Sequence, residues 1–219
     1  MNLRYSLLAL TMVGALSSSA RADDEPWQGF DETRIALVAG LIQPILLRGG
    51  NVELDVNHGR FVAGYSHGFS LDMQGSTVVG DARDQGLAFH LPYSTGLSVG
   101  YRFTDWFDVR LEGKVHRFEA RDEASGQSLF AYTTVTLGIG AYAQYRPFRD
   151  FGLDFPRWLQ GFVVIGSVRY WPRLWSSLPS GGHAFQSPNG QEQVHQPAEI
   201  GIANTPFIVN LALGYAVEF

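Results

Sequence analysis

Histidine and serine are the side chains of this sequence with the clearest capacity for acid–base or nucleophilic chemistry. There are six histidines and no cysteine, which excludes a thiol nucleophile and a thiolate metal site. Ser66 and His67 are adjacent, and neighbouring side chains of a strand point to opposite faces, so they cannot pair directly. His183 and His195 share one polar segment without companion ligands, which favours solvated residues over a metal site. The sequence therefore predicts no catalytic, metal or cofactor-binding residue.

Eight charged or titratable side chains have a spacing that suits ion pairing. They are Glu53, Asp55, Arg102, Asp108, Arg110, Glu112, Lys114 and His116. Alternate side chains of a strand point to one face, and in an enclosed space opposite charges must pair to offset their lost hydration. Arginine suits such pairs because its planar fork binds carboxylates at two points, and Lys114 is the only lysine among 16 basic residues. We expect these eight residues to form an internal ion-pair network.

The overall composition excludes two classes of protein. Charged residues make up 17% of the 219 residues, against about 25% in an ordinary globular domain. The formal net charge of −5 argues against a nucleic-acid partner, because phosphate binding needs clustered positive charge. No run of about 18 apolar residues occurs, which excludes a protein that crosses a membrane with helices.

Residues 1–22 have the features of a cleaved signal peptide. Arg4 supplies the positive charge, Leu7 to Leu16 form a short apolar run, and Ala20-Arg21-Ala22 fits a cleavage site. Cleavage would remove two arginines and give a net charge of −5 − 2 = −7. We expect an exported protein with a single domain over residues 23–219.

From about residue 35 onward, hydrophobic residues recur with a period of two, which is typical of β-strands with one apolar face. The first such segment contains Pro44 and is apolar on both faces, which suggests an edge or a bulge. The register of residues 162–170 stays undetermined because nearly all of them are apolar. The eight predicted strands are 35–47, 52–57, 60–73, 97–103, 107–116, 129–145, 162–170 and 205–219.

The connections between these strands alternate in character. Short or aromatic connections alternate with polar ones, of which residues 74–92 and 176–204 are the longest. This rhythm predicts an all-β fold, an antiparallel up-and-down barrel of eight strands. A further hairpin within residues 74–92 would raise the count to ten.

Two observations predict that the apolar face of the barrel points outward, into lipid. The opposite face is rich in small residues such as Gly64, Gly100 and Gly138, which suit the interior of a narrow barrel. Aromatic residues also gather near the strand ends, as in the two interfacial girdles of transmembrane barrels. They are Tyr101, Phe103, Trp106, Phe107, Tyr145, Phe148, Trp158, Tyr215 and Phe219 near the short turns, and Tyr132, Tyr170, Trp171 and Trp175 near the long loops. A secreted lipocalin-like barrel, with its apolar face inside, is the alternative.

The C-terminal segment resembles the last strand of Gram-negative outer-membrane β-barrel proteins. Its outward face would carry Val209, Leu211, Leu213, Tyr215, Val217 and Phe219. The strand rhythm of the whole mature chain is most similar to the small barrels of the OmpA, OmpX and OmpW type, and no motif ties it to one of them. The resemblance implies that Tyr215, Val217 and Phe219 form a signal read by the barrel-assembly machinery.

The resemblance also implies a location and partners. These are the outer membrane, its lipid and lipopolysaccharide, and periplasmic chaperones during biogenesis, for a protein that is a monomer. We expect a structural or surface-interaction role with a lumen filled by side chains. A narrow channel for small solutes or apolar molecules is the alternative, and a lipid-modifying enzyme is the third. No histidine has the H-x-S spacing of the outer-membrane lipid hydrolases, so the sequence favours a protein that is not an enzyme.

Overall fold

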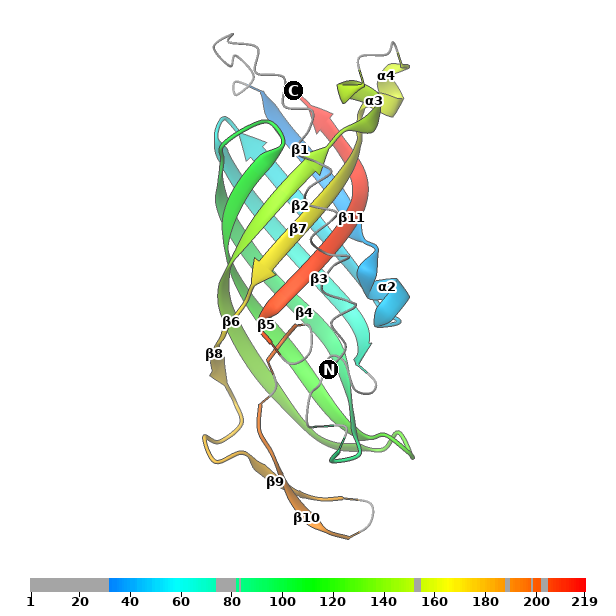
Figure 1. The fold of residues 1–219 in the computed structure, drawn as a ribbon, viewed down its shortest axis with the longest axis vertical. Helices are drawn as coiled ribbons and strands as arrows, with labels where there is room; N and C mark the ends of the chain where they lie inside the picture. The colour runs from blue at the N-terminus through cyan, green and yellow to red at the C-terminus, as the bar shows by residue number, and fades with distance from the viewer. Residues whose placement is uncertain are drawn as a thin grey trace, which may run out of the picture.

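The computed structural model describes residues 32–73, 82, 84–151, 155–187, 190–197, 199–201 and 205–219, so the predicted signal peptide lies outside the described residues. Eight strands form an antiparallel sheet with the order β5-β4-β3-β2-β1-β11-β7-β6, which a pairing of β6 with β5 closes into a barrel (Figure 1). Each barrel strand pairs with the next one along the chain, and the last pairs with the first. The predicted up-and-down barrel of eight strands is confirmed.

The barrel strands are unequal in length. They are β1 (Thr33–Gly40), β2 (Gly50–His58), β3 (Phe61–Met73), β4 (Leu87–Arg102), β5 (Phe107–Asp122), β6 (Ser128–Tyr145), β7 (Phe162–Tyr170) and β11 (Phe207–Glu218). β3 to β6 contain 13 to 18 residues, whereas β1, β2 and β7 contain 8 or 9. One side of the wall is therefore much taller than the other (Figure 1).

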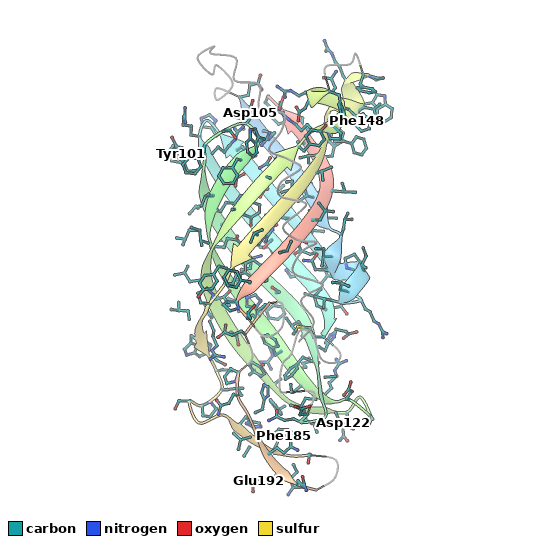
Figure 2. The ribbon with its side chains drawn as sticks, viewed as in Figure 1. Tyr101, Asp105, Asp122, Phe148, Phe185 and Glu192 are labelled. Atoms are coloured by element: carbon teal, nitrogen blue, oxygen red, sulfur yellow. The ribbon has the colours of Figure 1, made fainter. Side chains whose placement is uncertain are left out.

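The two ends of the barrel carry different elements. The terminal end has the C-terminus and two short helices, α3 (Pro147–Asp150) and α4 (Arg157–Gln160). The hairpin end has β9 (His183–Gln186) paired with β10 (Glu192–His195), and nearby β8 (Arg173–Ser176) pairs with β6 where β7 has ended. Figure 2 shows Asp105 and Phe148 at the terminal end, and Asp122 and Phe185 at the hairpin end.

The distribution of side chains is the reverse of that in a water-soluble protein. On β4, Leu97 and Val99 face outward and are 67% and 61% exposed, while Ser98 and Arg102 between and after them are buried. Large apolar side chains cover the outside of all eight barrel strands in the same way. Among the described residues, no helix combines the length and the hydropathy that a membrane-crossing helix needs.

The first predicted strand, residues 35–47, is wrong in its second half. β1 ends at Gly40 and is followed by the helix α2 (Ile42–Leu46), which lies on the side of the barrel (Figure 1). Pro44 marks this change, because proline lacks the N–H that a strand ladder needs but is tolerated in the first turn of a helix. Ladder pairing of β1 with β11 therefore stops at Gly40 and Ala212.

Both long segments predicted as polar loops contain strands. β4 begins at Leu87, so the second part of the predicted loop 74–92 belongs to the barrel. β3 pairs directly with β4, which excludes the two additional barrel strands that a count of ten requires. Residues 176–204 include β9 and β10, which form a hairpin outside the barrel wall.

The apolar face does not point outward along the whole barrel, as the sequence had suggested. On β3 the alternation reverses at Ser70, whose φ of 52° is rare for a residue other than glycine. Leu71, predicted to face outward, is therefore buried with Met73. Tyr132 and Trp171, predicted for the aromatic girdle, are also inside, whereas Tyr170 and Trp175 are exposed. The lumen at the hairpin end is apolar.

Candidate functional site in the barrel lumen

The eight predicted network residues are all buried inside the barrel, and five of them meet around Arg110 and Arg169. The Arg110 guanidinium is fully buried and donates to Asp55 and Asp108 at 2.6 Å each, and to Glu53 at 3.3 Å. Three carboxylates surround one cation here, and a second cation would reduce this excess of negative charge.

Arg169 on β7 supplies that second cation. Its guanidinium lies 3.0 Å from Glu53 and 3.6 Å from Glu112. The ring of Tyr142 lies beside both guanidiniums, at 3.9 Å from Arg110 Cζ and 4.7 Å from Arg169 Cζ. Tyr142 also donates a hydrogen bond of 2.7 Å to Glu112. We call Glu53, Asp55, Asp108, Arg110, Glu112, Tyr142 and Arg169 the ionic layer.

Small inward residues make room for the ionic layer. A Cβ atom at Gly140 would collide with the Glu112 carboxylate and with the Tyr142 ring, and one at Gly64 would lie 2.8 Å from Asp55 Oδ1. Interiors pack densely, so larger side chains at these positions would displace the ion pairs.

Arg102 belongs to a separate group at the terminal end. It donates to Asp105 at 3.2 Å and to the Gly59 carbonyl at 3.1 Å. Gln144 connects this end to the ionic layer, because it accepts from Arg34 at 2.6 Å and donates to Asp108 at 2.7 Å.

Lys114 and His116 lie on the other side of the ionic layer, toward the hairpin end. The Lys114 ammonium donates to Ser66 Oγ and lies 4.3 Å from the centre of the Trp171 ring. Within the described part of the chain, no carboxylate oxygen lies within 4.0 Å of it. Lys114 is thus a buried cation outside the ion pairs.

His116 forms a pair with Ser94 that sequence reasoning missed. The two residues are register partners on β4 and β5, and Ser94 Oγ lies 2.8 Å from His116 Nδ1. His116 Nε2 lies 3.0 Å from the hydroxyl of Thr136. In serine hydrolases a carboxylate orients the histidine, whereas a neutral hydroxyl holds this one.

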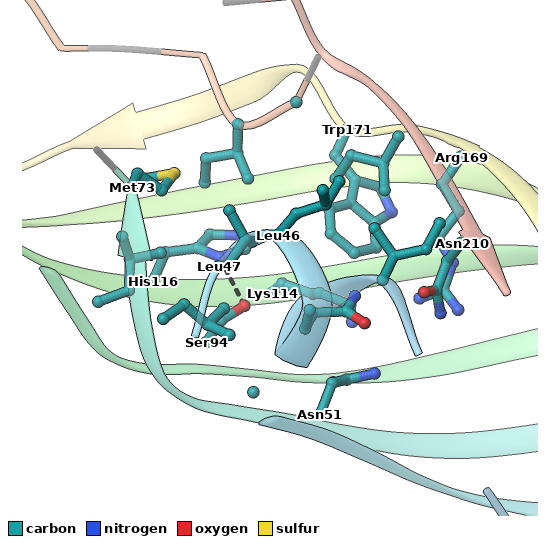
Figure 3. A pocket seen from close by; sticks show the side chains of 18 of the residues that line it. Leu46, Leu47, Asn51, Met73, Ser94, Lys114, His116, Arg169, Trp171 and Asn210 are labelled. Atoms are coloured by element: carbon teal, nitrogen blue, oxygen red, sulfur yellow. Dashed lines mark hydrogen bonds between the residues drawn. The ribbon is translucent and has the colours of Figure 1, made fainter. Parts of the chain in front are cut away.

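A cavity of about 150 Å³, the lateral cavity, adjoins Lys114 and the Ser94–His116 pair (Figure 3). Its walls come from α2, β2, β3, β4, β5, β7, β11 and the segment before β11. Among the described residues, no three His, Asp or Glu side chains are placed to bind a metal ion together.

Aromatic rings fill the lumen beyond the cavity. Phe118 and Tyr132 stack with ring centres 4.8 Å apart, and Phe89 meets both edge to face. His195 of β10 lies against Phe89 and Tyr132, at 5.1 and 5.8 Å. Burial, with a smaller contribution from His183, lowers the pKa of His195 to about 4. This aromatic cluster therefore joins the hairpin β9–β10 to the barrel.

The three residues of the predicted assembly signal all point outward. Tyr215, Val217 and Phe219 are exposed, and the Phe219 N–H donates to the Thr33 carbonyl at 2.9 Å. Tyr215 and Val217 form part of the outer face of β11 beside β1, and Phe219 directly follows that strand.

No protein-family model and no curated protein matches the chain. One solved structure similar to it is a major outer membrane protein from Thermus thermophilus, which is 14% identical. The match covers 86% of this chain and 98% of that chain, with a TM-score of 0.40. The barrel fold described above therefore rests on the strand pairing of this chain.

Proposed function

We propose that the protein is an integral β-barrel of the outer membrane. The observation that carries this proposal is the reversed distribution of side chains, with apolar residues around the outside and paired charges inside. In water such a surface would be unstable, whereas hydrocarbon requires it, and a closed barrel leaves no strand edge unpaired along most of the wall.

The role that the lumen favours is structural or surface-interacting rather than conducting. Two guanidiniums, four carboxylates and the Tyr142 ring meet in the ionic layer, which supports a lumen closed by side chains. An eight-stranded barrel is just wide enough for side chains to fill it. The hairpin β9–β10 would then stand outside the cell, where a rigid scaffold presents it for recognition.

The proposed partners follow from the outer surface. Outer-membrane lipid and lipopolysaccharide would contact the apolar belt, and the outward face of Tyr215, Val217 and Phe219 is available to the assembly machinery and to periplasmic chaperones during biogenesis. The chain pairs its own first and last strands, so closing the barrel needs no second copy and a monomer is sufficient.

Planar-bilayer conductance tests this proposal, with residues 23–219 refolded and the folded form identified by its different migration from boiled protein on a gel. We expect folded protein to resist carbonate extraction from vesicles and to be electrically silent. Steady, discrete openings would show that the lumen conducts, and the protein would then be a channel. Extraction by carbonate would contradict the membrane location itself.

The Ser94–His116 pair is the one observation that favours an enzyme. Release of fatty acid from phospholipid or lipid A by the wild type, and its loss in Ser94→Ala, would establish that function. We expect no such release, because among the described residues a neutral hydroxyl of Thr136, rather than a carboxylate, lies beside His116 Nε2.

A further inference from the structure

The barrel wall is interrupted between α2 and β11. The ladder between β1 and β11 ends at Gly40 and Ala212, with one further hydrogen bond of 2.8 Å from the Leu41 N–H to the Leu211 carbonyl. From Phe207 to Asn210, β11 has ladder pairing in the described chain with β7 alone. Unpaired backbone groups are costly in hydrocarbon, so this edge needs a cover.

The lateral cavity lies behind this interruption, with α2 in front of it (Figure 3). Leu46 of α2 and Val209 of β11 both line the cavity, and they are 68% and 43% exposed on the outside of the barrel. Asn210, the neighbour of Val209, lines the same cavity and is buried. The cavity therefore opens sideways, through the wall.

The lining of the cavity has an apolar part and a polar part. Leu71, Met73 and Leu91 contribute the apolar part toward the hairpin end. Lys114 and Asn210 contribute hydrogen-bonding groups on the side of the ionic layer. In Figure 3, Met73 lies at one side of the cavity and Asn210 at the other, with Lys114 between them. Such a lining suits a molecule with both an apolar and a polar portion.

Three buried polar atoms of residues that line the cavity have no hydrogen-bond partner among the described residues. They are the indole N–H of Trp171, which is a donor, and Oδ1 of Asn210 and Oε1 of Gln43, which are acceptors. The Lys114 ammonium, which has three donor hydrogens, donates to Ser66. A buried polar group without a partner is destabilising. The Trp171 N–H and the Lys114 ammonium, which lies 4.3 Å from the centre of the same ring, together suit an anionic acceptor.

The volume limits what can enter. A cavity of about 150 Å³ holds a group of roughly the size of benzene, so a head group and a few carbon atoms fit, and a whole lipid does not. The remainder of a chain would lie outside the wall, along the exposed side chains of Leu46 and Val209.

We propose that the lateral cavity binds the head group of a single-chain anionic amphiphile, a long-chain carboxylate, whose chain leaves the barrel between α2 and β11. The carboxylate lies near Lys114 and the Trp171 N–H, and the chain covers the unpaired edge of β11. This proposal rests on the membrane location proposed above, because the chain must leave the barrel into lipid.

Quenching of tryptophan fluorescence by 2-bromohexadecanoate tests the site, with the protein in phosphatidylcholine vesicles. The bromine is next to the carboxylate, so it would lie beside Trp171. We expect a saturable quenching component that is present in the wild type and absent in Trp171→Phe. The uncharged 2-bromohexadecan-1-ol should not produce this component.

Two variants locate the site and the charge. Val209→Phe narrows the opening and should weaken binding of the carboxylate by about tenfold or more, whereas Leu97→Phe, an outward change on β4, should leave it unaltered. Lys114→Met keeps a long apolar stem without the charge and should also weaken binding at least about tenfold, the size of one lost charge-assisted hydrogen bond. Each variant is compared only after the gel assay shows that it has folded.

Three results would overturn the proposal. The first is that folded protein that resists carbonate extraction shows no saturable quenching component from Trp171. The second is equal quenching by the alcohol, and the third is equal weakening of binding by Val209→Phe and Leu97→Phe. Extraction of the wild type by carbonate would instead contradict the proposed membrane location, so the two failures are distinguishable.

Discussion

The two halves of the lumen are filled by opposite chemistry. Toward the terminal end, the ionic layer is held by ion pairs around Arg110 and Arg169. Toward the hairpin end, Phe118, Tyr132 and their neighbours pack without charge. The first half is enclosed by all eight strands, whereas the second is walled mainly by β3 to β6 and β8. A complete wall can hold charges in fixed geometry, and an incomplete one relies on apolar contact with a docked hairpin.

Removing the Arg110 cation should lower the free energy of unfolding more than any other change predicted for the two halves of the lumen. Arg110→Met leaves Glu53, Asp55 and Asp108 without their main partner, and an uncompensated buried charge costs about 3–5 kcal/mol. We expect the free energy of unfolding, measured with urea in vesicles, to fall by about 4 kcal/mol. Arg121→Met breaks an ion pair with Glu119 that is partly solvent-exposed, and should cost under about 1 kcal/mol. Equal losses in the two variants would remove the distinction between buried and exposed pairs.

Truncating the aromatic half should have a smaller effect that is confined to the hairpin end. Phe118→Ala removes a fully buried ring stacked on Tyr132 and should cost about 3 kcal/mol. Amide hydrogen exchange is the measurement, and we expect faster exchange in β9 and β10 while β1 and β11 keep their protection. Uniform acceleration over all strands would show that the two halves unfold as one unit.

Acidification from pH 6.5 toward 4 should weaken the hairpin end. The folded pKa of His195 is lowered to about 4 from an ordinary value of 6.5, so the unfolded form binds more protons between these values. Docking of the hairpin is therefore fully stable above about pH 6.5 and weakens as the pH falls toward 4. We expect the free energy of hairpin docking to weaken by about 1–2 kcal/mol over this range, because solvent screens part of the site. In a protease-accessibility assay across this range, His195→Gln should be less sensitive to pH, and an unchanged pH response would contradict the assignment.

The barrel was predictable because alternation alone determines which side of a strand a residue occupies. In residues 107–116 the inward positions are Asp108, Arg110, Glu112, Lys114 and His116, and the structure places all five inside. The same face continues to Phe118 and Ala120, and there the rule that polar residues face inward no longer holds. A residue pattern does not show where along its length a barrel changes from charged to apolar.

The sequence reasoning missed Arg169 and the Ser94–His116 pair for different reasons. Arg169 was hidden because the surrounding residues of β7 are apolar on both faces, although a lone charge in such a strand is itself a signal for an inward position. Ser94 and His116 meet only through the register of β4 and β5. Pro44 signalled an irregularity in residues 35–47, and the structure shows a helix where an edge position or a bulge was expected.

The seam between β1 and β11 determines when the barrel can be completed. It joins seven residue pairs, from Arg34 with Glu218 to Gly40 with Ala212, which lie at opposite ends of the described chain. Contacts of such high sequence separation form slowly because a long loop must close first. Until the last strand arrives, both β1 and β7 are open edges able to pair with another chain. Two strand edges of the barrel thus stay exposed to aggregation until β11 pairs with both β1 and β7.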